Sequence, residues 1–144
     1  MKQYSAEIRQ TLDVSPEAAW SVIGAVGGVD KWFNGLIKSC RVENGQRFCE
    51  TADGLPLEED ILEVNHEEKV FRYGIPTQEM LPIQNILASM KIEEGAAGKS
   101  DITWSGTFDA EPADAEQAKE AIQGLWVMGL NSLEAYIQNQ PQAA

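Results

Sequence analysis

The sequence predicts an α+β fold, in which a curved, seven-stranded antiparallel sheet wraps around a long C-terminal helix and two short helices follow the first strand. Three observations predict it. Between residues 37 and 109 there are several short segments in which apolar and polar residues alternate, and pairs of turn-forming residues separate these segments. After Pro112 the apolar residues recur every three to four positions instead. A helix start at Ser15 and Pro16 separates the first strand from the rest. Hairpin-linked strands form a sheet with one apolar face, and the last helix is expected to cover that face.

The N-terminal segment is predicted to be one strand followed by two short helices. The strand covers Gln3 to Val14, where β-branched and polar residues alternate. Ser15 is the expected N-cap of the first helix, and Pro16 suits its first turn because that position needs no backbone N–H donor. The pair Gly27-Gly28 is expected to end this helix, and Val29 to Phe33 can form a short second one.

Six further strands are predicted, because each segment is short, apolar on alternate positions and bounded by turn residues. Their ranges are Ile37 to Glu43, Gln46 to Thr51, Leu55 to Val64, Val70 to Ile75, Ile83 to Ile92 and Lys99 to Phe108. The turns between them are expected at Asn44-Gly45, Asp53-Gly54, Asn65-His66 and Glu94-Gly95.

A long amphipathic helix is predicted after Pro112, with Asp114 as its cap. Its apolar residues at helical spacing are Ile122, Leu125, Trp126, Gly129, Leu133, Tyr136 and Ile137. The 144 residues suit a single domain. We expect that domain to span residues 1–137 and residues 138–144 to form a frayed C-terminal tail.

Strand alternation assigns one face of the sheet to the interior. The inward positions are Leu57, Glu59, Ile61, Phe71, Tyr73, Ile75, Ile86, Ala88, Met90, Ile92, Ile102, Trp104, Gly106 and Phe108. Glu59 is the exception in this set, because the neighbouring acids Glu58 and Asp60 face water while alternation turns Glu59 inward. By periodicity alone, such a face is an ordinary filled core.

The composition argues against several classes of partner. Twenty-three acidic and eleven basic residues give a formal charge of -12, which repels nucleic acids and anionic lipid surfaces. No stretch approaches the roughly 18 apolar residues of a membrane-spanning helix, and the N-terminus lacks the apolar stretch of a signal peptide. We therefore expect a cytoplasmic protein without stable membrane insertion, as a monomer or homodimer. With two cysteines and one histidine, neither a metal site nor a cofactor is expected.

The two cysteines are predicted to be cross-strand neighbours. A two-residue turn at Asn44-Gly45 pairs Val42 with Arg47 and Cys40 with Cys49. In a reducing compartment we expect both thiols to stay reduced and to act as small packing residues.

Five segments in order resemble the START-like or SRPBCC superfamily, whose fold is that of the birch-pollen allergen, and within it the polyketide cyclase/dehydrase family. They are Ser15-Pro16-Glu17-Ala18-Ala19-Trp20, Val29-Asp30-Lys31-Trp32-Phe33, Leu81-Pro82-Ile83, Ile102-Thr103-Trp104-Ser105-Gly106-Thr107-Phe108-Asp109 and Gly129-Leu130-Asn131-Ser132-Leu133. The resemblance covers nearly the whole chain. It implies a helix-grip fold with a deep cavity between the sheet and the C-terminal helix, and ligands among small lipids, polyketides, hormones or aromatics.

The predicted site combines this resemblance with strand parity. In the plant lachrymatory-factor-synthase branch, an arginine on the third strand and a glutamate on the fourth are active-site groups, and Arg47 and Glu59 resemble them. Both charges must be paired if they are buried, so we expect them to bridge to each other or to share a polar ligand group; an edge pair at the cavity mouth is the alternative. The predicted ligand contacts are Arg47, Leu57, Glu59, Ile61, Phe71, Tyr73, Ile86, Ala88, Met90, Trp104, Leu125, Trp126 and Gly129.

Single residues of that site have competing interpretations. Of the four tryptophans, Trp104 is the one most expected to touch a ligand, because it lies on the inward face. Gly129 either makes room for a ligand or lets the helix pack closely. His66 is assigned no role, because it falls in a turn. Ile86 departs from the family pattern, which has a pocket tyrosine there, so a methyl surface replaces a proton-donating phenol.

The sequence leaves two functions open. The first is binding or carriage of an apolar small molecule, such as a lipid, a polyketide or an aromatic compound. The alternative is a polyketide cyclase/dehydrase-type or isomerase-type enzyme, with Arg47, Glu59 and Tyr73 as its candidate catalytic groups. We favour binding, because no nucleophile-base pair, phosphate loop or dinucleotide fingerprint occurs. A protein-interaction module would require a large exposed apolar patch, which the polar outward positions do not supply.

Overall fold

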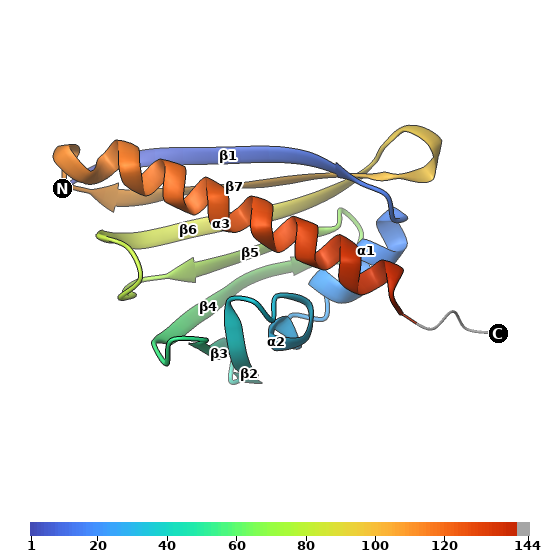
Figure 1. Ribbon diagram of the computed structural model, residues 1–144, viewed down its shortest axis with the longest axis horizontal. Coiled ribbons are helices and arrows are strands. Elements are labelled where there is room, and N and C mark those ends of the chain that lie inside the picture. The colour runs from blue at the N-terminus through green and yellow to red at the C-terminus, as the bar shows by residue number, and fades with distance from the viewer. Residues whose placement is uncertain (141–144) are drawn as a thin grey trace.

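The computed structural model describes residues 1–140, which form one seven-stranded antiparallel sheet and three α-helices (Figure 1). The strands are β1 (Lys2–Leu12), β2 (Ile37–Glu43), β3 (Gln46–Thr51), β4 (Pro56–Asn65), β5 (Val70–Ile75), β6 (Ile83–Glu94) and β7 (Ser100–Ala110). The helices are α1 (Pro16–Ile23), α2 (Val29–Trp32) and α3 (Pro112–Gln138), with a short 3-10 turn at Ala96–Gly98. The predicted helix-grip fold is confirmed.

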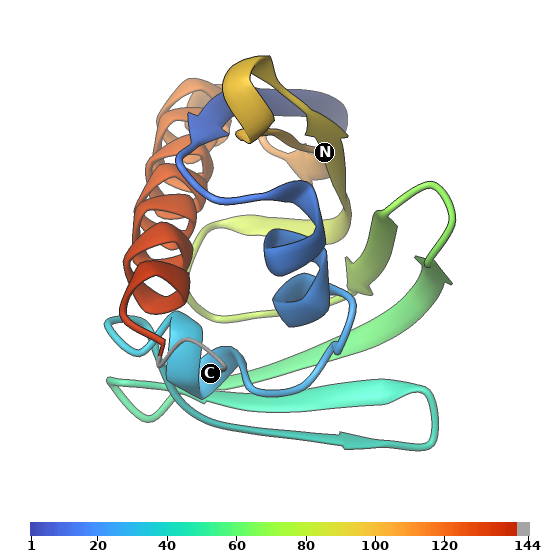
Figure 2. The same cartoon turned by 90° about the vertical axis from the view of Figure 1, so that its right-hand side faces the viewer.

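The sheet order is β1-β7-β6-β5-β4-β3-β2, so strands β2 to β7 form a continuous meander and β1 joins it beside β7. α3 lies diagonally across the sheet (Figure 1). The end-on view shows the sheet bending from β1 and β7 round to β2 and β3, with α3 on the open side of the curve (Figure 2). α1 and α2 lie at one end of this space.

The first helix starts as predicted and ends earlier than predicted. Ser15 Oγ accepts a hydrogen bond from the Ala18 amide at 3.1 Å, and Pro16 occupies the first turn. The helix stops at Ile23 with Gly24 as its C-cap, before the Gly27-Gly28 pair. A side chain at Gly24 would place its Cβ 2.5 Å from Trp20 Cε2, so the indole needs a glycine at this position.

The β2–β3 hairpin has the predicted register. Asn44 and Gly45 both have positive φ, of 50° and 76°, as a two-residue hairpin turn requires. Val42 pairs with Arg47 and Cys40 with Cys49. Both cysteines are free thiols.

Register shifts interrupt three of the ladders, and strand alternation did not predict them. They lie between Ile37 and Ser39 where β2 pairs with β3, between Ile61 and Glu63 where β4 pairs with β5, and between Gln84 and Leu87 where β6 pairs with β7. An extra residue reverses the facing of the strand beyond it. The exposed side chains of Leu62 and Leu87 lie at the last two irregularities, and both approach Gly74.

α3 begins at Pro112, so Asp114 lies in its first turn and is not its cap. Glu111 holds the N-cap position without a side-chain cap bond. Seven residues of the helix are buried: Ala115, Ala118, Ile122, Trp126, Gly129, Leu130 and Leu133. Gln138, the first residue of the predicted tail, still belongs to the helix; the part of that tail from residue 141 to 144 lies outside the described residues.

Between residues 1 and 140, no helix combines the length and the apolar character that crossing a membrane demands.

Candidate ligand cavity

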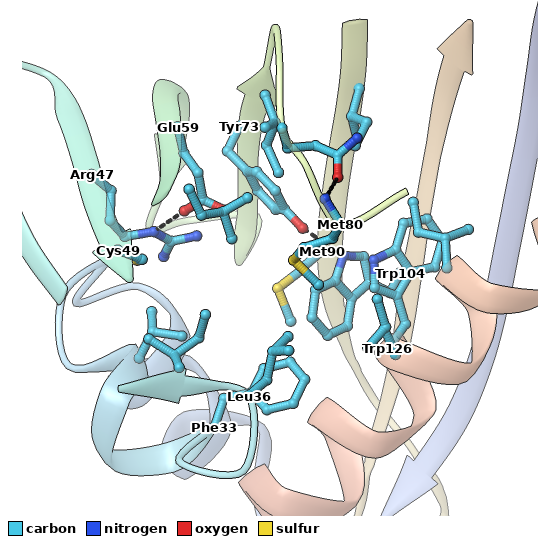
Figure 3. A pocket seen from close by; sticks show the side chains of 18 of the residues that line it. Phe33, Leu36, Arg47, Cys49, Glu59, Tyr73, Met80, Met90, Trp104 and Trp126 are labelled. Atoms are coloured by element: carbon cyan, nitrogen blue, oxygen red, sulfur yellow. Dashed lines mark hydrogen bonds and ion pairs between the residues drawn. The ribbon is translucent and has the colours of Figure 1, made fainter. Parts of the chain in front are cut away.

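A cavity of about 100 Å³ lies between the inner face of the sheet, α2, α3 and the β5–β6 loop. The close view shows side chains from the sheet, from α3, from the β5–β6 loop and from the segment after α2 pointing into one space (Figure 3). The volume of this cavity is smaller than the roughly 300–1,000 Å³ typical of sites for drug-sized ligands. A ligand of that size therefore requires the wall to move, whereas a single-ring compound is closer to the space present.

Ten of the thirteen predicted ligand contacts line this cavity: Arg47, Leu57, Glu59, Phe71, Tyr73, Ile86, Met90, Trp104, Leu125 and Trp126. Ile61, Ala88 and Gly129 do not. Ile61 is half-buried beside the β4 irregularity. Ala88 is buried between its cross-strand neighbours Tyr73 and Gly106, and its methyl group does not reach the cavity.

Gly129 serves close packing. A Cβ at this position would lie 2.8 Å from Phe33 Cε2 and 3.1 Å from Trp104 Cζ3. Both rings form the cavity wall. Gly129 therefore lets the helix approach Phe33 and Trp104, which is the close-packing interpretation of this glycine. Gly124, also in α3, faces open space and is exposed.

Twelve lining residues were not among the predicted ligand contacts, and most of them lie outside the central strands. They are Ile23, Val29, Trp32, Phe33, Leu36, Ile37, Cys49, Ile75, Gln78, Met80, Leu81 and Ile122. Most come from α2, from the segment after it or from the β5–β6 loop, where no period of two or 3.6 residues marks a facing direction. Two of them carried a usable indication: Ile75 is on the inward face that strand alternation assigns, and Ile122 shares the apolar stripe of α3 with Trp126.

Arg47 and Glu59 are cross-strand partners on β3 and β4, and Arg47 Nε donates to Glu59 Oε1 (Figure 3). Their side chains are 8% and 7% exposed. Arg47 Nη1 also donates to the Val26 carbonyl at 2.8 Å. Val26 is a β-branched residue with a φ of 68°, an unfavourable conformation, and this hydrogen bond ties its carbonyl to the buried pair.

Arg47 stays charged. Burial acts to lower the pKa of Arg47, but the Glu59 carboxylate outweighs it, and the pKa lies above its ordinary value. The guanidinium carbon also lies 5.1 Å from the ring centre of Phe71 and 5.5 Å from that of Tyr73. Two aromatic faces thus support the cation.

Tyr73 and Trp104 form a second polar contact in the wall. Trp104 Nε1 donates to Tyr73 Oη at 3.1 Å, and the Trp104 ring stacks on Trp126 with centroids 5.5 Å apart. Burial, and then the Glu59 carboxylate, raise the pKa of Tyr73 well above its usual range. Tyr73 is therefore an uncharged phenol that can donate a hydrogen bond.

Gln78 holds the β5–β6 loop in place. Its Nε2 donates to the carbonyls of Leu81 and Ile83, at 2.8 and 2.9 Å, and its Oε1 accepts from the amides of Met80 and Leu81, both at 2.8 Å. Met80 and Leu81 line the cavity. The Gln78 carboxamide therefore determines where these two apolar side chains lie.

Cys49 lines the cavity, whereas Cys40 is only half-buried. Burial raises the pKa of the Cys49 thiol, which keeps it protonated and makes it a poor nucleophile. His66 is exposed, as its turn position predicts, and its Nδ1 accepts a hydrogen bond from Trp20 Nε1 at 3.1 Å. Within residues 1–140, no three His, Cys, Asp or Glu side chains gather closely enough to hold a metal ion.

Comparison with known proteins supports the fold and the family. The family described as "Polyketide cyclase / dehydrase and lipid transport" matches residues 3–138. No curated protein matches the sequence significantly.

Among solved structures, an uncharacterized protein from Bacillus thuringiensis is 23% identical, with a TM-score of 0.82 over 96% of this chain and 100% of the other. The protein XoxI from Bacillus cereus is 24% identical, with a TM-score of 0.80 over 96% and 97%. Truncated norcoclaurine synthase from Thalictrum flavum is 10% identical, with a TM-score of 0.76 over 97% and 96%. At these identities the likeness shows the fold alone.

Proposed function

The chain belongs to the polyketide cyclase / dehydrase and lipid transport family, and on this premise we propose that it binds a small apolar molecule in the cavity between the sheet and α3. The observation that carries the proposal is the composition of the wall. Of the 22 lining residues, 18 are apolar and four are polar, namely Arg47, Glu59, Tyr73 and Gln78. A largely apolar wall with a few placed polar groups is typical of small-molecule sites.

The polar groups give the proposed site an orientation. Arg47 and Glu59 lie on β3 and β4, while Trp126 and Leu125 come from α3 across the cavity. A ligand with one polar end is therefore proposed to place that end toward Arg47, Glu59 and Tyr73 on β3, β4 and β5, and its apolar body toward α3. On this proposal, Arg47→Ala or Glu59→Gln weakens binding of a ligand that has a polar group.

Native mass spectrometry of the purified protein tests the proposal, followed by organic extraction and identification of what co-purifies. A retained apolar compound in a one-to-one complex is expected. In parallel, tryptophan fluorescence is titrated with fatty acids, flavonoids and polyketide-like aromatics, using Trp104→Phe as the variant whose response should fall. If nothing co-purifies and no compound shifts either the fluorescence or the melting temperature, the proposal is wrong.

An enzyme of cyclase, dehydratase or isomerase type is the second candidate, favoured by the buried Glu59 carboxylate beside the Tyr73 phenol. Norcoclaurine synthase has been solved in complex with dopamine and hydroxybenzaldehyde on this same fold, with a TM-score of 0.78. The co-purified compound separates the two candidates. Conversion to a product by wild type and not by Glu59→Gln supports catalysis, and release of the unchanged compound supports binding.

A further inference from the structure

The cavity has few hydrogen-bonding positions left for a ligand, because its polar side chains largely bind protein groups. Gln78 uses all of its capacity: both amide hydrogens and both lone pairs of its oxygen bind backbone groups of its own loop and of Ile83 at the start of β6. A primary amide can make no more than these four bonds. Gln78 therefore offers a ligand no donor or acceptor, although it lines the wall.

Tyr73 offers the uncharged donor of the wall, whereas the remaining N–H groups of Arg47 belong to a guanidinium already bound to Glu59 and the Val26 carbonyl. The Tyr73 oxygen accepts from Trp104 Nε1, and within residues 1–140 its hydroxyl hydrogen has no protein acceptor. The hydroxyl end of the side chain points into the space between Met80, Met90 and Trp104 (Figure 3). The indole holds the phenol oxygen as an acceptor and leaves its hydrogen free. A ligand atom at this position must accept a hydrogen bond.

The charge of the wall sums to zero. Arg47 and Glu59 are the charged residues among those that line the cavity, and they neutralise each other. A carboxylate entering this space would add a buried negative charge without a cation of its own. The chain's net charge of -12 adds a further unfavourable field. An uncharged acceptor meets neither penalty.

We infer that the cavity selects uncharged, largely apolar molecules with a carbonyl oxygen that accepts from Tyr73 Oη, and that it discriminates against carboxylates such as free fatty acids. This inference rests on the proposed binding function. It deepens that function by naming the ligand class and one specificity-determining residue.

Three single-ring probes test the inference, since they match in size and differ in one group: acetophenone, benzoate and ethylbenzene. Binding is followed by NMR through the methyl signals of Met80 and Met90, both of which line the cavity. In wild type, acetophenone is expected to bind most tightly, by about tenfold or more over benzoate at neutral pH. Its advantage over ethylbenzene should be about threefold to tenfold, the worth of one neutral hydrogen bond.

The Tyr73→Phe variant should remove the advantage of acetophenone over ethylbenzene and leave the affinity for ethylbenzene unchanged. Tyr136→Phe is the matched control, because Tyr136 lies on α3 outside the cavity lining.

Tighter binding of benzoate than of acetophenone overturns the inference while the binding function stands. So does an unchanged affinity of Tyr73→Phe for acetophenone, which would place the carbonyl at Arg47 instead. Failure of all three probes to shift either methyl signal would count against the binding function itself, and the inference falls with it. The wild-type comparison requires no variant to fold.

Discussion

Arg47 on β3 and Glu59 on β4 are direct cross-strand partners, and both are buried in a wall that is otherwise almost entirely apolar. Two opposite charges in such surroundings depend on each other, because either one alone would be an uncompensated charge in an apolar interior. The energetic importance of the pair therefore exceeds that of an exposed ion pair.

Replacing one member of this pair is expected to destabilise the fold. Arg47→Ala should lower the free energy of unfolding by about 3 to 5 kcal/mol, since it leaves Glu59 without a partner and frees the Val26 carbonyl. Arg47→Met combined with Glu59→Leu should recover most of that loss. Urea denaturation of wild type, Arg47→Ala and the double variant measures their free energies of unfolding. Arg72→Ala is the control: Arg72 Nε lies 3.3 Å from Glu63 Oε1, both side chains are exposed, and the expected loss is below about 1 kcal/mol. Equal losses for Arg47→Ala and Arg72→Ala would contradict the buried-pair account.

Gly129 and Gly124 form a matched pair on α3. Gly129→Ala should destabilise the protein by about 1 to 3 kcal/mol, because its Cβ would overlap Phe33 and press on Trp104. Gly124→Ala meets open space and should stabilise it by about 0.5 to 1 kcal/mol through helix propensity. Thermal or urea unfolding of the two variants checks the opposite signs. Stabilisation by Gly129→Ala would show that the rings can move aside without cost.

Gln78→Ala should loosen the β5–β6 loop selectively. Four hydrogen bonds are lost, and we expect faster amide hydrogen exchange at Met80 and Leu81 together with a loss of about 1 to 3 kcal/mol. Gln84→Ala, at an exposed position of β6, is the control and should leave exchange in the loop unchanged. Protection at Met80 and Leu81 that survives Gln78→Ala would mean that packing alone fixes the loop.

Stability should fall at alkaline pH because of Tyr73 and Cys49. Their folded-state pKa values are raised above the ordinary 10.0 and 9.0, so above those values the unfolded chain loses these protons while the folded chain keeps them. The linked stability is fully present below the ordinary pKa values. It is lost as the pH rises from each ordinary pKa toward the raised one, at about 1.4 kcal/mol per pH unit for each group. Urea unfolding of wild type and Tyr73→Phe across this range should show a shallower decline for the variant. If the free energies of unfolding of wild type and Tyr73→Phe fell in parallel as the pH rose, Tyr73 would have no part in the alkaline loss of stability.

Local sequence patterns account for the elements, the sheet register of the first hairpin and the facing of Arg47 and Glu59. Alternation fixes which side of a strand a residue occupies, and the Asn44-Gly45 turn fixes which residues oppose each other. These rules hold only while the ladder is regular. They therefore placed Ile61 in the cavity, although the neighbouring irregularity leaves this residue half-buried and outside the lining.

The surroundings of the two charges and the size of the cavity come instead from the packing of the whole chain. Phe33, Leu36 and Met80 enter the wall from α2, the segment after it and the β5–β6 loop, which have no periodic pattern. The partners Tyr73 and Trp104 lie on β5 and β7, and Gly129 meets Phe33 from a helix far along the chain. Such contacts depend on how elements distant in sequence pack together, because side-chain volume and strand curvature set their spacing and neither is a property of any one segment.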